Sequence, residues 1–219
     1  MKRKILLIAT MLCALTAATD LLAATIGPYL GVALGRSGAN MPSASPFEVD
    51  TVPNGSTTNT KKGWAERGFA GYNFTHYIGV EIGYTYYARA LYNSRSSVGN
   101  SQLKYNFRTY DGEVKVYLPL GYTGVNIYAL GGASHVSETL NYADGGLAFS
   151  GNIAPASPGT SHGYHTVALY GAGANITIMK HVVFDLEITQ SRGWGNFNTN
   201  PNAIPILNLA TLGIAYNFC

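Results

Sequence analysis

The stretch that decides the fold of this chain is residues 78–87, which read IGVEIGYTYY. One set of alternate positions holds Ile78, Val80, Ile82, Tyr84 and Tyr86, and the other holds Gly79, Glu81, Gly83, Thr85 and Tyr87. Because successive side chains of a strand point to opposite faces, this period of two predicts a β-strand with one apolar face.

The same period continues on both sides of this stretch. It predicts eight strands, over residues 26–35, 64–74, 78–88, 104–120, 125–136, 164–178, 182–190 and 204–218. Short connections, at 75–77, 121–124 and 179–181, alternate with long ones, at 36–63, 89–103, 137–163 and 191–203. Short turns at one end and long loops at the other are typical of membrane barrels. We therefore expect an all-β fold, an eight-stranded antiparallel transmembrane β-barrel with short periplasmic turns and long extracellular loops.

The composition agrees with a strand-built membrane protein. Only 11% of the 219 residues are charged, less than half of the roughly 25% that is usual in soluble domains. Glycine (26 residues) and tyrosine (16 residues) are abundant, and both are poor helix formers. No run of 18 apolar residues follows the N-terminus, which excludes a helical membrane span there.

The first two dozen residues have the layout of a secretory signal peptide. Lys2, Arg3 and Lys4 precede an apolar stretch, and small residues follow at Ala23 and Ala24. We predict a cleaved signal peptide over residues 1–24 and an outer-membrane barrel domain over 25–219, with cleavage after Ala23 or Ala24. The part after Ala24 carries 11 basic and 10 acidic residues, so no basic excess points to nucleic acid.

Pairing the strands across the three short turns separates apolar from charged residues. A three-residue turn at 75–77 keeps Arg67 off the apolar face, where it would cost about 2–4 kcal/mol near the middle of a membrane. Since the outer wall faces lipid, the charged face must be the interior. The predicted interior polar network comprises Arg67, Glu81, Glu113, Lys115, Asp185 and Glu187. An eight-stranded barrel has room for side chains only, so a packed ion-pair network is favoured over a narrow conduit.

Residues 69–84 (FAGYNFTHYIGVEIGY) resemble, without gaps, the hairpin of the second and third strands in OmpA-type transmembrane domains and other small outer-membrane β-barrels. Lys115 and Glu187 are similar to that family's interior Lys and Glu. Asp185 departs from the pattern, because the family commonly has Arg there to pair with the residue corresponding to Glu81, so Arg67 or Lys115 would have to take this role. The resemblance implies a barrel without the C-terminal peptidoglycan-binding domain of full-length OmpA.

The last strand is similar to the C-terminal β-signal recognised by the outer-membrane assembly machinery. Its matching residues are Thr211, Gly213, Tyr216 and Phe218. Recognition of such a strand works by β-augmentation, in which backbone pairing supplies affinity and side chains supply specificity. The resemblance therefore implies the assembly machinery and periplasmic chaperones as partners. Cys219 follows the signal as an additional residue.

Two histidine patterns could carry chemistry. His135 and Ser137 share the outward parity and are similar to the His-x-Ser pair of outer-membrane lipid A deacylases, but a base and nucleophile also need a carboxylate, and Glu138 has the wrong parity. His162 and His165 could bind a metal, yet no Cys or carboxylate accompanies them at ligand spacing. We expect no enzyme, no catalytic residue, no metal and no cofactor, with a lipid A-modifying enzyme as the less favoured alternative.

The expected location is the cell outer membrane of a Gram-negative bacterium. Long loops on a rigid scaffold are where external partners bind. We expect a structural role in envelope integrity or a surface interaction such as adhesion through these loops, with a small porin-like channel as the alternative. The expected partners are outer-membrane lipid, lipopolysaccharide and a host or surface ligand at the loops, and no nucleic acid.

Overall fold

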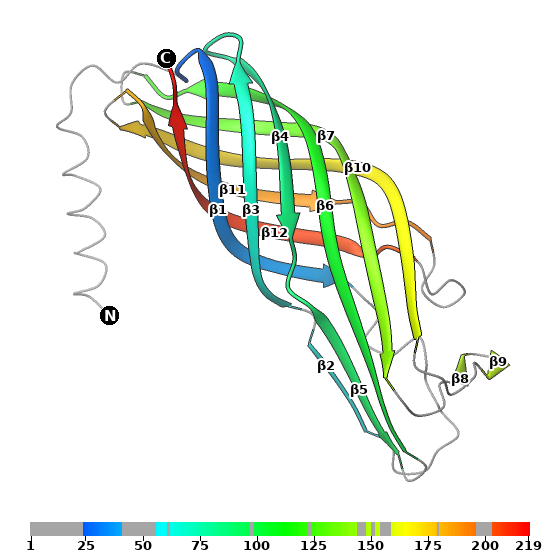
Figure 1. Ribbon diagram of the computed structural model, residues 1–219. Coiled ribbons are helices and arrows are strands. Elements are labelled where there is room, and N and C mark those ends of the chain that lie inside the picture. The colour runs from blue at the N-terminus through cyan, green and yellow to red at the C-terminus, as the bar shows by residue number, and fades with distance from the viewer. Residues whose placement is uncertain are drawn as a thin grey trace, which may run out of the picture.

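The computed structural model (Figure 1) shows an antiparallel barrel whose strands extend past one end of the cylinder. The residues that it describes are 24–40, 56–60, 62–96, 99–121, 124–143, 148–149, 152–153, 159–178, 180–195 and 203–219. The predicted signal peptide therefore lies outside the described residues except for Ala24. No helix within the described ranges has the length and apolar character to cross a membrane.

Eight strands close into a ring, as the sequence predicts. In the order in which they pair around the barrel, they are β1 (Gly27–Asn40), β3 (Lys62–Asn73), β4 (Ile78–Tyr86), β6 (Gly99–Pro119), β7 (Val125–Ala143), β10 (Gly159–Ile178), β11 (Val182–Ser191) and β12 (Ile206–Asn217). Pairing of β6 with β7 and of β1 with β12 closes the ring. Every neighbouring pair is antiparallel.

The predicted hairpin registers are confirmed. Tyr72 pairs with Val80 and Gly71 with Glu81 across the first short turn. Ala174 pairs with Leu186 across the turn at 179–181, and the hairpin of β6 and β7 also has the predicted register. Apolar and charged side chains therefore separate as expected, because a slip of one residue would exchange the two faces.

The strand ends differ from the prediction, and the strands are longer. The tracts expected as loops over 89–103 and 137–163 contain the β5 strand (Ala90–Ser96), the first residues of β6, the end of β7 and the start of β10. A membrane-crossing strand needs about 9–11 residues, whereas β6 has 21, β7 has 19 and β10 has 20. About half of each of these strands therefore extends beyond the hydrocarbon region.

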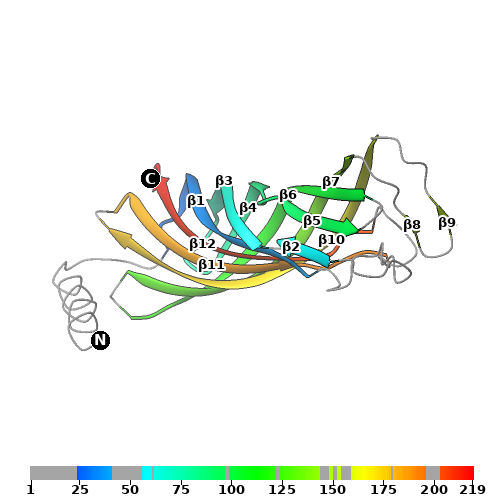
Figure 2. The same cartoon turned by 90° about the horizontal axis from the view of Figure 1, so that it is seen from below.

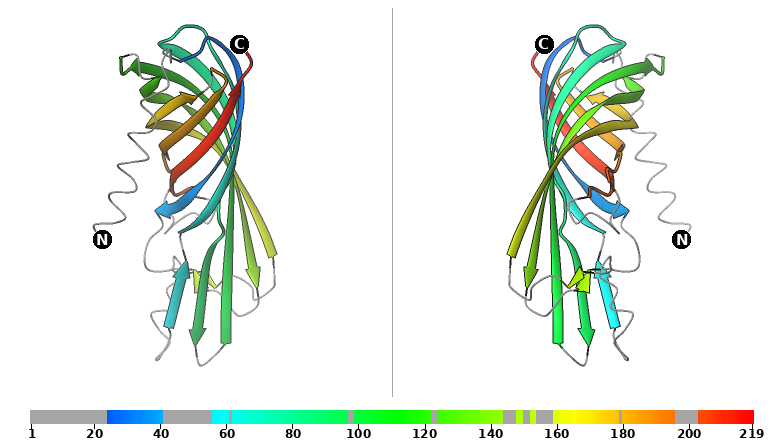
Figure 3. Two further views of the ribbon diagram at one scale, coloured as in Figure 1. Left: turned by 90° about the vertical axis from the view of Figure 1, so that its left-hand side faces the viewer. Right: turned by 90° about the vertical axis from the view of Figure 1, so that its right-hand side faces the viewer.

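The projecting part is a sheet at the loop end of the barrel, as Figures 2 and 3 show from other directions. In it β5 pairs with β6, and β2 (Ser56–Thr60) pairs with β5. A small hairpin of β8 (Ala148–Phe149) and β9 (Asn152–Ile153) lies on the β7–β10 connection. We name the sheet formed by β2, β5 and the loop-end parts of β6, β7 and β10 the projecting sheet.

The outer wall of the barrel is apolar between two sets of aromatic residues. Large exposed apolar side chains on several strands, including Leu34, Ile82, Leu186 and Leu212, form this wall. Exposed aromatic residues flank it at the turn end (Tyr72, Phe74, Tyr77, Tyr216, Phe218) and at the loop end (Trp64, Tyr84, Tyr110, Tyr170). Aromatic side chains of this kind mark the two membrane–water interfaces of transmembrane barrels.

Candidate functional site

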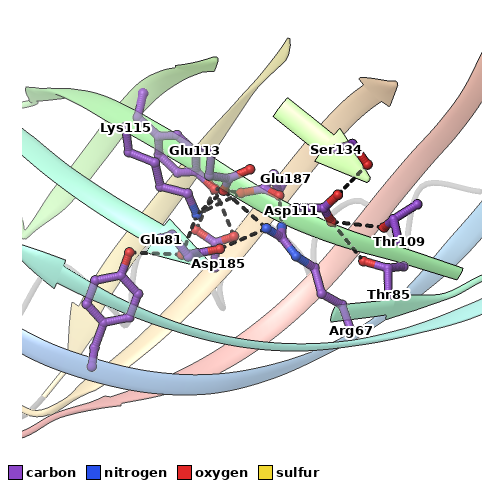
Figure 4. Close-up of polar contacts among 12 residues, drawn as sticks. Arg67, Glu81, Thr85, Thr109, Asp111, Glu113, Lys115, Ser134, Asp185 and Glu187 are labelled. Atoms are coloured by element: carbon purple, nitrogen blue, oxygen red, sulfur yellow. Dashed lines mark hydrogen bonds and ion pairs between the residues drawn. The ribbon is translucent and has the colours of Figure 1, made fainter. Parts of the chain in front are cut away.

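A polar layer crosses the barrel interior and contains all six residues expected there, of which five are buried and Asp185 is half-buried (Figure 4). Arg67, on β3, is its central cation. Its Nη2 donates to Glu81 on β4 (2.9 Å) and to Glu113 on β6 (3.1 Å), and its Nη1 donates to Glu187 on β11, across the barrel. Gly83 lies beside this guanidinium, and a Cβ there would come within 2.9 Å of Arg67 Nε. The small residue therefore leaves room for the arginine.

Lys115 is the second cation and contacts the same three glutamates. Its Nζ lies 2.7 Å from Glu81, 2.8 Å from Glu187 and 3.4 Å from Glu113. The ammonium also lies 4.9 Å from the centre of the Tyr128 ring, a cation–π distance. Each glutamate thus contacts both cations, which joins four strands in one ion-pair network. Both Arg67 and Lys115 take the place of the family's arginine by pairing with Glu81.

Two tyrosines complete the polar layer, and the sequence did not indicate them. Tyr29 lies over Gly71 and donates from its hydroxyl to Glu81 at 2.9 Å. Tyr128 lies over Gly173 and donates to Glu187 at 2.9 Å. The tyrosine rings occupy the space that the two glycines leave, since a Cβ at either glycine would lie 2.3–2.4 Å from atoms of the tyrosine side chain.

Two further acidic groups of the interior, Asp185 and Asp111, have partners of their own. Asp185 accepts hydrogen bonds from the Tyr128 hydroxyl at 2.8 and 2.9 Å and forms no ion pair with either cation among the described residues. Asp111 lies nearer the loop end, where three hydroxyl groups donate to it, from Thr85, Thr109 and Ser134. Arg89 is exposed in the break between β4 and β5.

The three central glutamates are spaced as the ligands of a bound cation could be. One oxygen each of Glu81, Glu113 and Glu187 lie within 4.8 Å of one another, and hard divalent cations prefer such oxygens. However, Arg67 and Lys115 already contact these carboxylates at ion-pair distance. The arrangement therefore fits an internal ion-pair layer better than a metal centre.

Apolar side chains and close packing fill the interior on both sides of the polar layer. A small cavity of about 30 Å³ lies on the turn side, between Tyr29, Phe69 and Asn73, with room for about one water molecule. A larger apolar cluster fills the loop end and comprises Ala65, Tyr87, Ala90, Tyr105, Phe107, Val136, Leu140, Val167, Ile204, Leu207 and Leu209. Ile204 belongs to the β11–β12 connection, so this connection also contributes to the apolar cluster.

Glu138 is an isolated buried carboxylate at the loop end of β7, beyond the lipid-facing residues of that strand. It points inward, between Val136 and Leu140 on its own strand, and pairs across to Phe107 on β6. Neither carboxylate oxygen has a hydrogen-bond partner among the described residues. Burial raises the pKa of Glu138 to about 8, because an apolar site disfavours the charged carboxylate.

The histidine patterns do not form compact sites. His135 stacks on Tyr164 and contacts the Thr166 hydroxyl at 3.1 Å, while Glu138 lies on the opposite face of the strand. His162 and His165 lie on opposite faces of β10, and His165 stacks on Trp194. These placements bring together neither a carboxylate with His135 nor a pair of metal ligands.

The residues of the predicted assembly signal lie on β12, between β1 and β11. Thr211 and Gly213 face the interior, and Tyr216 and Phe218 face outward with ring centres 5.2 Å apart. Their role in assembly stays a prediction.

A model of the outer membrane protein beta-barrel domain matches residues 5–218 of this chain. An uncharacterized protein of Coxiella burnetii is 32% identical over 197 residues, which cover 78% of this chain and 76% of that protein. The solved structure of OprG from Pseudomonas aeruginosa has a TM-score of 0.53 at 11% identity, with 91% of this chain and 99% of that chain covered. Neisserial surface protein A has a TM-score of 0.52 at 14% identity, with 88% and 97% covered.

This chain belongs to the outer-membrane β-barrel family, and it is a protein of the bacterial outer membrane. The two solved structures are similar in fold and carry no information about a ligand of this chain.

The polar layer predicts a strong dependence of stability on Arg67. Arg67→Met leaves three buried glutamates facing only Lys115, and breaking a buried ion-pair network of this kind costs about 3–5 kcal/mol. Adding Glu187→Gln to Arg67→Met should recover part of this loss, because one unpaired charge is removed. Urea unfolding of the two single variants and the double variant in lipid vesicles measures the coupling. Strictly additive losses would contradict a shared network.

The burial of Glu138 predicts a pH dependence of barrel stability that can be assigned to this one residue. Its raised pKa makes the folded state bind more protons than the unfolded state between about pH 4.5 and 8, so stability should fall as pH rises through this window. Glu138→Gln should remove this dependence and stabilise the barrel at pH 8.5, by at most about 5 kcal/mol. Unfolding midpoints at pH 4.5 and 8.5 test this, with exposed Glu66→Gln as the control. An equal pH slope in wild type and Glu138→Gln would refute it.

Proposed function

We propose that this protein is a non-enzymatic surface-interaction barrel of a Gram-negative outer membrane, in which a closed cylinder supports a projecting sheet that contacts an external partner. Support for the closed cylinder comes from the interior. The ion-pair layer of Arg67 and Lys115 is followed toward the loop end by the apolar cluster, so ions crossing the barrel would meet two barriers in series.

The observation that carries the proposal is the length of the strands at the loop end. Residues 135–143 of β7 pair with β6 and β10 well beyond the apolar outer wall. Strands that only need to cross a membrane would end near that wall. A paired sheet presents the connecting segments on a rigid support, and surface loops on rigid supports carry binding functions in many folds. Envelope support alone gives no reason for this extension.

The porin-like alternative predicts single-channel conductance, whereas our proposal predicts none. With the polar layer intact, purified protein in planar bilayers should show no steps above background from pH 5 to pH 8. Reproducible single-channel steps that are absent from a mock preparation would replace the proposal with the porin-like function. Mass spectrometry of lipid A after expression of the protein tests the enzyme alternative. A lipid A-modifying enzyme would change the acylation of lipid A, whereas our proposal predicts no change.

The interaction itself is tested by removing the β7–β10 connection, which the projecting sheet supports, without disturbing the barrel. Tyr142 pairs with Gly159, so residues 143–158 can be replaced by a two-residue Asn-Gly turn that joins the two strands. Non-adherent bacteria that express wild-type protein should bind epithelial monolayers several-fold more than bacteria that express this variant. Heat-modifiable gel migration confirms that the variant still forms a barrel. Equal binding by the two strains would count against a surface interaction through the β7–β10 connection.

A further inference from the structure

A groove of about 650 Å³ lies on the barrel wall at the loop end of β1 and β12, outside the polar layer. Two basic residues, Arg36 and Lys62, line it together with Asn40 and Asn208. Its volume is in the range of pockets that bind small molecules. None of the features already described uses these side chains.

The strand register explains why a groove forms here. Ala210 stands between Arg36 on β1 and Ile188 on β11, and Gly38 stands between Lys62 on β3 and Asn208 on β12. Ala210 and Gly38 have almost no side chain, whereas their neighbours in the register are long. The two small residues therefore leave a trough that has cationic side chains on one side.

Both cations are available to a ligand. Within the described part of the chain, neither Arg36 nor Lys62 forms an ion pair or a side-chain hydrogen bond. Glu66, an outward carboxylate on β3, pairs across to Leu34 and forms no ion pair with either of them. A groove with two free positive charges at its rim attracts an anion.

The position of the groove identifies the kind of anion. Arg36 pairs across to Trp64, which is 71% exposed, and exposed tryptophans of membrane proteins gather at the membrane–water interface. Leu212 is the next outward-facing residue after Ala210 on β12, and it belongs to the apolar wall. The groove therefore has a cationic end at headgroup depth and continues into a wall that faces acyl chains.

We propose that this groove binds a phosphorylated membrane lipid. Arg36 and Lys62 donate hydrogen bonds to the phosphate, Asn208 lies beside the headgroup, and an acyl chain lies along Ala210 and Ile188 toward Leu212. Guanidinium and ammonium groups suit phosphate, and the apolar wall below them suits a chain rather than a free ion. This site is separate from the projecting sheet, so it does not depend on what that sheet contacts.

Didecanoyl phosphatidic acid is a suitable probe, added to protein in a neutral detergent and followed by native mass spectrometry at low salt. Binding to wild type should weaken at least tenfold in the double variant Arg36→Gln/Lys62→Gln. Ala210→Phe should also weaken it at least tenfold, because it fills the groove without changing charge. Arg108→Gln removes an exposed arginine that stacks on Tyr86 on another part of the wall, and it should leave binding within twofold.

Two further probes separate lipid from free phosphate. Didecanoyl phosphatidylcholine should bind at least tenfold more weakly than phosphatidic acid, and millimolar inorganic phosphate should not displace the bound lipid. Displacement by inorganic phosphate would overturn the lipid assignment in favour of a simple anion site. Equal weakening by Arg108→Gln and by the double variant would overturn the site, since it would show attraction by overall charge. Unchanged binding in Ala210→Phe would also overturn it.

Discussion

Arg67 is the constraint on which the interior depends. A single guanidinium holds carboxylates from β4, β6 and β11, so it joins strands that are neighbours in the barrel and a strand on the opposite wall. Charges removed from water are costly unless they are paired and hydrogen-bonded. The interior of a narrow barrel leaves little room for water to do this, and Lys115 and two tyrosines supply the remaining contacts. The buried charges of the polar layer are therefore stable only when all of its members are present.

The arrangement of tyrosine, glycine and glutamate occurs twice, on opposite walls. Tyr29, Gly71 and Glu81 lie side by side on β1, β3 and β4, and Tyr128, Gly173 and Glu187 do so on β7, β10 and β11. In both rows the glycine receives the ring of the tyrosine, and the hydroxyl donates to the glutamate. Each wall thus orients one carboxylate toward the shared cations through contacts between its own strands.

The fold and the interior site could be predicted from the sequence only where the strands contact lipid. Where one face of a strand meets lipid, alternation in the sequence is strong, so the registers of the three short hairpins and the inward position of Arg67 followed from residue types alone. Beyond the membrane neither face meets lipid, and residues 137–143 and 159–163 lack the alternation, so they were expected as loops. Tyr29 and Tyr128 were missed because tyrosine suits both the interface and a polar interior. Glu138 had the inward parity, but nothing in the sequence showed that its surroundings are apolar.

The projecting sheet also sets a distance. About nine residues of β7 extend beyond the apolar wall, which is roughly 30 Å along the strand and roughly 20 Å in height at a tilt of about 45°. A flexible tether of equal length would sample many heights and lose conformational entropy when it was captured. Paired strands have already lost that freedom during folding. Under the proposed function, a partner of the projecting sheet therefore binds at one fixed height above the lipid, and a particle that cannot come within that height cannot reach the sheet.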